Sequence, residues 1–470
     1  MPNKSAPVFR KVLVANRGEI ACRVIRTCRR LGVDTVAVFS DADADAAHVA
    51  LATEAVRVGP APVRDSYLNV EAVLGAIRSS GADAVHPGYG LLSEDRAFAE
   101  AVRTSGAVFV GPPPEALEAF GDKLRARALA RTVGVEPPPG SDAPVRHDDP
   151  ETLRAVAARI GFPLLVKGVR AGGGIGMQVV ESLAALGPAI EACARRTRAA
   201  FGDDRVYVER YFSGPRHLEV QVLCDGHGNA VALGERECSV QRRYQKIIEE
   251  TPSPAAFLQG EVGEQRRQRL FDDALRVVRA AGYVGAGTVE FVADAAGRSY
   301  FLEVNARLQV EHPVTELVTG LDLVELQLRI AAGQPLPPEA LSPTFSGHAV
   351  EARVYAEDPG RRFAPQPGKI ERLRWPGPVP GIRIDAGVAQ GAEVTSHYDP
   401  LLAKVVAHGR SRDEAISRLD GALSETDLEV VGPKGPRATN LQYLRRVLSS
   451  DSFASGAYAT HLGEIVASEA

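Results

Sequence analysis

Polar side chains occupy every second position in one stretch of the sequence, "YFLEVNARLQVEHPVTE", which runs from residue 300 to residue 316. The stretch begins like an apolar strand, and alternate side chains of a strand lie on the same face. That face collects carboxylates, amides and a guanidinium, in the order Glu303, Asn305, Arg307, Gln309 and Glu311. Carboxylate and amide oxygens are the ligands that hard divalent cations prefer. The stretch therefore predicts a polar site just before its His-Pro pair.

A β-hairpin is expected to bring a further carboxylate to this face. The segment "GTVEFVADAAGRSYFLEVN" has the pattern of two strands joined by a turn at residues 294–297. If the loop has four residues, Ala293 pairs with Arg298, and Glu290 pairs with Phe301 on the face of the polar row. A change of register by one residue would turn Glu290 to the opposite face.

With this register, two carboxylates and an amide oxygen converge, from Glu290, Glu303 and Asn305. They predict a Mg²⁺ site with few protein ligands, because nucleotide phosphates and water can complete the octahedron. The alternative interpretation is a solvated strand face.

A glycine-rich segment, "FPLLVKGVRAGGGIGM", places Lys167 at the end of an apolar run and follows it with Gly172, Gly173, Gly174 and Gly176. Glycines let backbone N–H groups approach phosphate oxygens closely, and a neighbouring lysine supplies a cation. A flexible hairpin tip is the alternative. The segment is not a Walker A loop, because the sequence contains no G-x-x-x-x-G-K-[ST].

Lysine usage points to the same kind of ligand. Only 8 of the 55 basic residues are lysines, and three of these eight lie in "GDKLRA", "LLVKG" and "QRRYQKIIEE", as Lys123, Lys167 and Lys246. An exposed position tolerates arginine, whereas a phosphate site can require a compact ammonium group.

The elements that position these residues begin with a βαβ unit. "KVLVANRG" is a predicted strand, "EIACRVIRTCRRLG" is an amphipathic helix closed by Gly32, and "VDTVAVFS" is a second strand. Such a unit predicts a parallel sheet with a ligand crevice at the carboxyl ends of its strands. The C-terminal region mixes strands such as "HAVEARVYA" with the amphipathic helix "SRDEAISRLDGALSET".

Proline-rich segments near residues 111, 135 and 333 suggest the boundaries between domains. We expect a first domain at 1–117, a central domain at 118–335 that contains a smaller subdomain at about 140–212, and a last domain at 345–455. The predicted fold class is α/β, with a C-terminal α+β domain.

Composition excludes several classes of function. Acidic residues outnumber basic ones, 59 to 55, which argues against nucleic acid as a partner. Five cysteines without a C-x-x-C pair indicate reduced thiols, and no stretch of 18 apolar residues predicts a membrane span. A soluble, cytoplasmic protein is therefore expected.

The motifs resemble, in the same order, those of the biotin carboxylases of the ATP-grasp superfamily. The resemblance spans roughly residues 8 to 455 and rests on "KVLVANRGEIACRV", "HPGYGLLSE", "GDK", "PRHLEVQVL", "ERECSVQRRYQK", "GTVEF", "FLEVNARLQVEHPVTE", "GHAVEARVYAED", "PQPGKI" and "HYDPLLAKV". It implies an N-terminal Rossmann-like parallel sheet domain, a central ATP-grasp domain with a mobile glycine-rich lid subdomain, and the C-terminal α+β domain.

The resemblance also implies an activity, which is the ATP-dependent carboxylation of biotin by bicarbonate through carboxyphosphate. Mg²⁺ or Mn²⁺ carried by ATP is expected at Glu290, Glu303 and Asn305. Bicarbonate is expected at Lys246, Arg307, Gln309, Val310 and Glu311. Glu311 would be the general base, and a carboxylate within hydrogen-bonding reach suits that role. The catalytic set is Arg353, Glu311, Lys246 and Arg307.

The resemblance also implies which residues contact biotin and ATP. Arg353 matches the family arginine that stabilises the enolate-like oxygen of deprotonated biotin, and Asp399 matches a residue near the biotin pocket. The residues expected to contact ATP are Lys123, Lys167, Gly173, Gly174, Glu209, Arg210, Tyr211, Phe212, His217 and Tyr244.

The sequence departs from the family pattern in two places. In the lid loop, Arg170 and Ala171 replace glycines and Ile175 occupies the place of an arginine, which predicts one cation fewer near the triphosphate. Tyr244 stands where histidine is common, and tyrosine can hydrogen-bond or stack but cannot become cationic.

The expected partners are a biotin carboxyl carrier protein, a carboxyltransferase of an acyl-CoA carboxylase that uses acetyl-CoA or propionyl-CoA, and a second copy of the chain in a homodimer. The carrier is expected to be separate, because neither Met1 nor Met177 lies beside a lysine. Another ATP-grasp ligase and a non-catalytic nucleotide-binding regulatory subunit are the alternatives.

Overall fold

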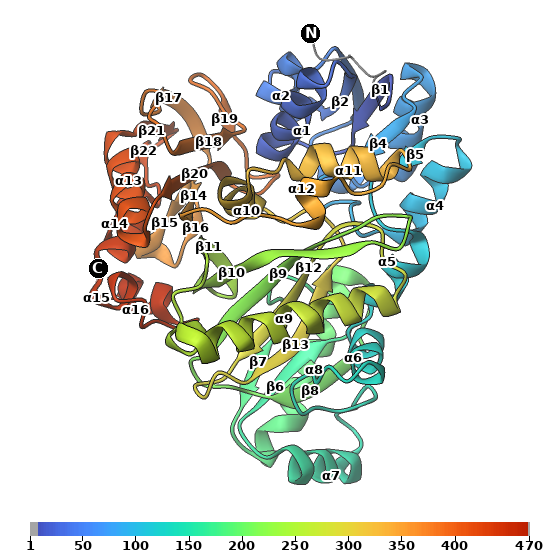
Figure 1. Cartoon of the computed structure of the whole chain (residues 1–470), viewed down its shortest axis with the longest axis vertical. Helices are drawn as coiled ribbons and strands as arrows, with labels where there is room; N and C mark the ends of the chain where they lie inside the picture. Colours follow the sequence, from blue (N-terminus) through green and yellow to red (C-terminus); the bar gives the residue numbers. More distant parts are fainter. Residues whose placement is uncertain (1–7, 469–470) are drawn as a thin grey trace.

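The computed structural model describes residues 8–468, so residues 1–7, where the predicted first domain begins, and residues 469–470 lie outside the description. Figure 1 shows the N-terminal sheet at the top, the central strands in the middle, a small sheet with helix α7 at the lower end, and the C-terminal elements beside the centre. Within residues 8–468, no helix is long and apolar enough to span a membrane.

The N-terminal part is a parallel five-stranded sheet, as predicted, with the order β3-β2-β1-β4-β5. The strands are β1 (Lys11–Val14), β2 (Asp34–Ser40), β3 (Glu54–Gly59), β4 (Ala84–His86) and β5 (Val108–Phe109). Helix α1 (Gly18–Arg30) buries its apolar positions, and Gly32 follows its C-cap residue with a φ of 71°. The other helices are α2 (Ala47–Leu51), α3 (Val70–Ser80), α4 (Arg96–Thr104), α5 (Pro114–Gly121) and α6 (Lys123–Thr132).

The glycine-rich segment belongs to a small unit with its own core. A three-stranded sheet of order β7-β6-β8 packs against two helices, and apolar side chains between Val145 and Val208 form the core between them. Its elements are α7 (Pro150–Ile160), β6 (Leu164–Gly168), β7 (Gln178–Val180), α8 (Leu183–Phe201) and β8 (Val206–Arg210). The glycine loop connects β6 to β7.

One eight-stranded sheet crosses the predicted boundary near residue 340. Its order is β13-β12-β9-β10-β11-β14-β20-β18, and β11 pairs with β14 in antiparallel register from Ile248↔Ala352 to Thr251↔Ala349. The strands are β9 (Arg216–Cys224), β10 (Ala230–Arg242), β11 (Gln245–Thr251), β12 (Gly285–Ala293), β13 (Ser299–Asn305), β14 (His348–Tyr355), β18 (Ile382–Ala386) and β20 (Leu401–Gly409). The central and C-terminal parts therefore share one hydrogen-bonded sheet.

Helices cover this sheet, and a four-stranded and a two-stranded sheet complete the C-terminal part. Helix α9 (Gly260–Ala280) crosses the central strands (Figure 1), and α10 (His312–Thr319), α11 (Leu323–Ala331) and α12 (Pro338–Leu341) follow β13. The C-terminal helices are α13 (Arg412–Glu425), α14 (Leu441–Ser449), α15 (Asp451–Ala454) and α16 (Leu462–Ser468). The remaining strands are β15 (Glu357–Asp358), β16 (Ala364–Pro365), β17 (Gly368–Arg374), β19 (Glu393–Val394), β21 (Asp427–Gly432) and β22 (Gly435–Arg437).

The predicted hairpin of β12 and β13 exists, but its predicted register is wrong by one residue at the turn. Ala293 pairs with Ser299 rather than Arg298, and Phe291 rather than Glu290 pairs with Phe301. A bulge then inserts one extra residue in β13, and Glu290 pairs with Glu303. The bulge therefore restores the predicted meeting of the two carboxylates.

The bulge also corrects the prediction for Phe301. A regular strand would place Phe301 on the face of Glu303, whereas here Phe301 and Val304 are buried together in the apolar core. The extra residue shifts the alternation by one position. Phe301 and Val304 therefore lie on the apolar face of the hairpin, and Glu303 lies on the polar face with Glu290.

Candidate active site

The predicted metal ligands lie together on the β12–β13 hairpin. Asn305 Nδ2 donates a hydrogen bond of 2.8 Å to Glu290 Oε1, and Glu303 is ion-paired with Lys123. His217 Nε2 lies 3.0 Å from Glu290 Oε2. Burial opposes ionisation of Glu290, but Lys246 and then His217 hold its pKa well below the ordinary value of a glutamate. Glu290 is therefore an anion that is available to a cation.

The donor set at this hairpin fits a divalent metal ion. Ligand atoms of His217, Glu219 and Glu290 lie within 4.8 Å of one another. Two of the three donors are carboxylates, and of the predicted ligands Glu303 lies opposite Glu290 in the ladder while Asn305 is hydrogen-bonded to Glu290. Hard cations such as Mg²⁺ prefer oxygen donors of this kind.

Lys246 is the centre of the carboxylate cluster. Its Nζ atom lies 2.7 Å from Glu290 Oε1 and 2.8 Å from Glu311 Oε1, and it is also ion-paired with Glu219. Burial alone would lower the pKa of Lys246, but the three carboxylates, led by Glu219, raise it well above its ordinary value. Lys246 is therefore a fixed cation, which suits the binding of an anion and excludes a role as a neutral base.

Glu311 is a buried carboxylate held between two cations. It is the N-cap residue of α10 and is fully buried, and its Oε2 atom accepts a hydrogen bond of 3.0 Å from Arg353 Nη2. Burial would raise the pKa of Glu311, but Lys246 and Arg353 hold it below the ordinary value. Glu311 is therefore ionised at neutral pH and can accept a proton.

The polar row continues past the end of the strand. The alternation suggested that the whole polar row lies on a strand, but strand β13 ends at Asn305. The loop before α10 therefore contains Arg307, Gln309 and Glu311. The loop still brings them together, because Arg307 Nη2 donates to Asn305 Oδ1 at 2.9 Å and Arg307 Nη1 donates to Gln309 Oε1 at 3.1 Å. The Val310 carbonyl accepts a hydrogen bond of 2.8 Å from Lys404.

The two predicted biotin residues lie in different surroundings. Arg353, on β14, is buried, and its Nη2 atom lies 2.6 Å from Glu249 Oε1 as well as beside Glu311. Asp399 is exposed, and its side chain accepts a hydrogen bond of 2.9 Å from the Leu401 amide. Arg353 therefore belongs to the buried ion-pair cluster, whereas Asp399 lies in the exposed loop before β20.

The residues predicted to contact the nucleotide line the junction between the small sheet and the hairpin. Lys167 Nζ lies 3.0 Å from Glu209 Oε1, and Arg127 binds the other oxygen of the same carboxylate at 2.8 Å. Phe212 stacks on Tyr300 with 4.9 Å between ring centroids. The Glu209 side chain is therefore occupied by two cations.

Three other predicted nucleotide residues are held by neighbours. The Arg210 guanidinium donates to the Ile160 carbonyl at 2.8 Å, and the Tyr211 amide donates to the Pro163 carbonyl at 3.0 Å. His217 Nδ1 lies 2.9 Å from Gln241 Nε2. Burial, together with the nearby Lys167, lowers the pKa of Lys123 to about 8.

The glycine loop lies against Tyr244, in the turn between β10 and β11. Gly174 has a φ of 73°, and a Cβ atom on it would lie 2.8 Å from the Tyr244 ring. Arg170, which replaces a glycine of the family, lies 4.0 Å from Asp203 within the same small unit. Ile175 is 44% exposed. The loop therefore contacts the main sheet through Gly174 and Tyr244.

Several residues of the site were not predicted from the sequence. Glu219, Glu249 and Lys404 are fully buried at the cluster, and Glu94 binds Arg307 Nε at 2.8 Å. Glu219 lies in the "PRHLEVQVL" block and Lys404 in "HYDPLLAKV", so the motifs contained both of them. Their roles depend on contacts between β9, β11, β14 and β20, which periodicity alone does not define.

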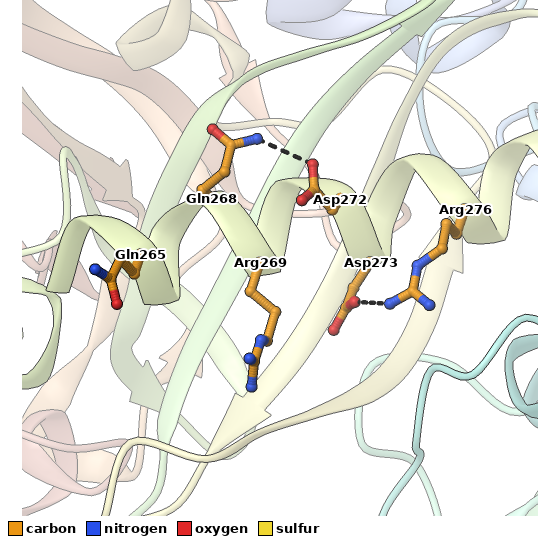
Figure 2. Close-up of a pocket in the computed structure, with 6 residues that line it drawn as sticks. All are labelled: Gln265, Gln268, Arg269, Asp272, Asp273 and Arg276. Atoms are coloured by element: carbon orange, nitrogen blue, oxygen red, sulfur yellow. Dashed lines mark hydrogen bonds and ion pairs between the residues drawn. The ribbon is translucent and has the colours of Figure 1, made fainter. Parts of the chain in front are cut away.

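A hollow of about 560 Å³ lies elsewhere, along helix α9. All six residues that line it come from this one helix, and the bond of 2.9 Å from Gln268 Nε2 to Asp272 lies within it (Figure 2). None of the six belongs to the carboxylate–lysine cluster. The hollow has the residues of a solvated helix face, and the ion-pair cluster rather than the hollow is the candidate active site.

Three family models match the chain in sequence order. They are the biotin carboxylase N-terminal domain at residues 8–117, the carbamoyl-phosphate synthase L chain ATP-binding domain at 122–339, and the biotin carboxylase C-terminal domain at 351–464.

Curated relatives and solved structures agree with these models. A biotin carboxylase from Allochromatium vinosum is 45% identical over 97% of this chain and 98% of its own length. The propionyl-CoA carboxylase alpha chain of Ruegeria pomeroyi is 43% identical over 96% of this chain and 67% of its own length. The chain spans 60% of the length of rat methylcrotonoyl-CoA carboxylase subunit alpha.

One similar structure is described as holding nucleotide, metal and bicarbonate. It is the biotin carboxylase domain dimer of 2-oxoglutarate carboxylase from Hydrogenobacter thermophilus, in complex with MgADP, ADP and bicarbonate. It covers 97% of this chain, and this chain covers 97% of it, with a TM-score of 0.90 and 39% identity. The fold and the carboxylate–lysine site define an ATP-dependent ligase of the ATP-grasp class. Within that class, the chain belongs to the biotin carboxylase family.

Proposed function

We propose that this chain uses ATP and bicarbonate to carboxylate the biotin of a separate carrier protein. The observation that carries the proposal is the position of Glu311, whose two carboxylate oxygens contact Lys246 and Arg353 beside the Glu290–Asn305 pair. This arrangement puts a base, two fixed cations and a set of oxygen ligands for a metal around one buried point. Those are the groups that phosphorylation of bicarbonate by ATP requires.

The metal would be held by Glu290, Glu303 and Asn305, and it supplies neutralisation of phosphate charge. Lys123, Lys167, Gly173 and Gly174 would bind the phosphates, with Glu209, Arg210, Tyr211, Phe212, His217 and Tyr244 around the rest of the nucleotide. Support comes from the positions of these residues along the junction between the small sheet and the hairpin.

Bicarbonate would bind between Lys246 and Arg307, with Gln309 and the Val310 backbone fixing its orientation. Glu311 takes its proton, and the freed oxygen attacks the γ-phosphorus of ATP to give carboxyphosphate and ADP. A carboxylate with a lowered pKa is a weak base, so this transfer depends on the negative charge of bicarbonate, which offsets the two cations around Glu311.

Carboxyphosphate then breaks down to CO₂ and phosphate, and the phosphate removes the proton from N1′ of biotin. Arg353 would stabilise the negative charge on the ureido oxygen, and N1′ attacks CO₂. Preorganised charge of this kind is commonly worth about 3 kcal/mol for one donor. Asp399 would contribute from the exposed loop before β20, at the entrance of biotin.

We also propose the wider assembly. The reaction would be the first half of an acyl-CoA carboxylase that acts on acetyl-CoA or propionyl-CoA, with a carrier protein and a carboxyltransferase as partners, and with the chain as a cytoplasmic homodimer. The alpha chains of propionyl-CoA and methylcrotonoyl-CoA carboxylases among the relatives support an acyl-CoA acceptor. Co-purification of the tagged chain with a carboxyltransferase, followed by assay of the complex with each acyl-CoA, would identify the acceptor.

Phosphate release from ATP tests the proposed reaction. With Mg²⁺ and bicarbonate present, free biotin at saturating concentration is expected to increase the rate, and omission of bicarbonate is expected to abolish the increase. The result that favours a different ATP-grasp ligase or a regulatory subunit is a rate that biotin leaves unchanged in a folded protein that still binds ATP.

A further inference from the structure

Two buried glutamates next to the ion-pair cluster lie directly opposite each other on neighbouring strands. Glu249 on β11 is directly opposite Glu351 on β14 in the antiparallel ladder. Directly opposite residues in such a ladder have Cβ atoms about 5 Å apart on the same face of the sheet. Both side chains are fully buried. Two carboxyl groups are thus placed side by side without solvent.

Neither carboxyl group forms a hydrogen bond within residues 8–468, which is unusual for buried carboxylates. All four oxygen atoms of Glu249 and Glu351 lack a hydrogen-bond partner there. Glu249 does have one ion partner, because its Oε1 atom lies 2.6 Å from Arg353 Nη2, although not in hydrogen-bonding geometry. An unpartnered buried carboxylate is costly, so a group of this kind calls for an explanation in the site it faces.

Arg353 Nη2 is shared by two carboxylates. Glu311 Oε2 accepts its hydrogen bond at 3.0 Å, and Glu249 Oε1 lies closer, at 2.6 Å. The Nε atom of the same guanidinium is buried without a partner in the described chain. Glu249 therefore competes with Glu311 for one nitrogen of Arg353, and the guanidinium retains donor capacity.

We propose that Glu249 is a positioning residue that, as a carboxylate, holds Arg353 in place for the biotin oxyanion and limits its grip on the base Glu311. This inference rests on the proposed function. Glu249 touches no reacting atom in this assignment. Without the Glu249 carboxylate, Glu311 would be the remaining partner of Arg353 Nη2. The Arg353–Glu311 ion pair would then be stronger, and it would draw Arg353 away from the biotin oxygen and Glu311 away from bicarbonate.

The charges around Glu249 make its ionisation sensitive to pH. Burial raises the pKa of Glu249 to about 7, although Arg353 opposes the rise and Glu311 adds to it. Burial raises the pKa of Glu351 well above its ordinary value. Burial therefore favours the neutral form of Glu351, whereas Glu249 loses its proton near pH 7. The groups that face this pair from the packed elements are Arg353, Glu311, Lys246, Cys238 and Lys404.

The test compares Glu249→Gln with Glu351→Gln in biotin-dependent phosphate release. Glutamine keeps the shape of the side chain and removes its charge, so Glu249→Gln is expected to lower kcat about ten-fold at about pH 8.5 and to raise KM for biotin. KM for ATP is expected to stay within about two-fold, because Arg353 contacts no predicted nucleotide residue. At about pH 6 the wild-type Glu249 is itself protonated, so the rates of variant and wild type are expected to converge.

Glu351→Gln is the matched control. It lies opposite Glu249, is equally buried and is expected to match the wild-type rate at both pH values, because within the described chain Glu351 forms no ion pair with Arg353 and burial favours its neutral form, which glutamine resembles. The ratio of variant to wild type cancels the titration of bicarbonate itself. A ratio for Glu249→Gln that does not change with pH, or an equal effect of the two substitutions, would overturn the proposal.

Thermal unfolding of both variants establishes that each is folded. Should Glu249→Gln not fold, Glu249→Asp carries the same comparison, because its shorter side chain moves the carboxylate away from Nη2. It is expected to be slower than wild type at about pH 8.5 and equal to it at about pH 6, and equality at both pH values would refute the positioning role. Failure of the proposed function is recognised separately, since the wild type would then show no stimulation by biotin.

Discussion

At the scale of single residues, the candidate site consists of charged side chains whose ionisation is fixed by their buried partners. Lys246 and Arg353 are both buried against carboxylates, which keeps each of them protonated over the whole physiological range of pH. Glu311 is ionised for the same reason, and its position between the two cations makes its basicity dependent on what else is bound. The negative charge of bound bicarbonate would then raise the basicity of Glu311 and so promote the deprotonation of bicarbonate itself.

Replacement of the proposed base, Glu311, gives the first residue-level prediction. Glu311→Gln is expected to lower biotin-dependent turnover by about 10²- to 10⁴-fold, the usual contribution of a general base, while Kd for ATP changes little. Steady-state phosphate release and nucleotide binding by calorimetry measure the two quantities. Glu264→Gln is a suitable control, since Glu264 is exposed on α9 and is paired only with Arg267 there. Unchanged turnover in Glu311→Gln would remove Glu311 from its assigned role.

Much of the site could be predicted from the sequence because the polar residues are adjacent in the chain. Arg307, Gln309 and Glu311 converge after the strand ends, since the loop before α10 is short. Glu249 and Lys404 could not be found in this way, because each is brought to the site by a strand from another part of the chain. A charged residue indicates a functional site through its burial, and the sequence alone does not show that Glu249 and Lys404 are buried.

At the scale of elements, the bulge in β13 shows what the pattern of alternation left undetermined. Period-two alternation predicted a hairpin, and the hairpin exists, but the turn has one residue more than the assumed loop and the bulge compensates for it. Turn length and bulges depend on backbone conformations that many residue types adopt, so they are poorly specified by polarity. The meeting of Glu290 and Glu303 on one face was predicted correctly, whereas the face of Phe301 was not.

A second bulge has the same consequence for Lys246. In the β10–β11 ladder, Gln241 pairs with Lys246 while the preceding residue, Val240, pairs with Ile248. Ile247 is therefore the extra residue, and the slip changes the face on which Lys246 lies relative to Ile248. Both bulges are next to the candidate site, where each directs one charged side chain toward it.

The glycine loop yields a prediction for an element rather than a single side chain. Gly174→Ala is expected to raise KM for ATP about five-fold or more, because the alanine would be strained at a φ of 73° and its Cβ would meet the Tyr244 ring at 2.8 Å. The strain alone is of order 1–3 kcal/mol. Steady-state kinetics with ATP varied measures the effect.

Gly172→Ala in the same loop is the matched control. Its φ is not positive, and a Cβ there would meet nothing within 4 Å, so KM for ATP is expected to be unchanged. Equal effects of Gly172→Ala and Gly174→Ala would show that general loop flexibility, and not the contact with Tyr244, controls the binding of ATP.

At the scale of the whole molecule, one sheet joins parts that the sequence had suggested were separate domains. The predicted boundary near residue 340 falls in a proline-rich connection, yet β11 and β14 on either side of it are hydrogen-bonded neighbours. The charged site lies at this junction, with Lys246 on one strand and Arg353 on the other. Proline-rich segments mark breaks in the chain, but they do not report whether the flanking strands pair again.

The opposite face of the same junction holds the last prediction, which concerns stability. Glu250, next to Glu249 on β11, binds His348 at 2.6 Å and Arg412 at 2.6 and 2.9 Å, and it accepts a hydrogen bond from Tyr458. Burial would raise the pKa of Glu250, but the bonds to His348 and Arg412 lower it to about 2.

A folded pKa below the unfolded value of about 4.3 stabilises the protein above that pH, and this stability is lost as the pH falls toward 2. Glu250→Gln is therefore expected to lower the free energy of unfolding by about 3 kcal/mol at pH 7, and by progressively less below about pH 4. Urea unfolding of variant and wild type across this pH range measures the difference, and a difference that stayed constant with pH would show that the carboxylate charge of Glu250 does not hold the C-terminal helices to the sheet.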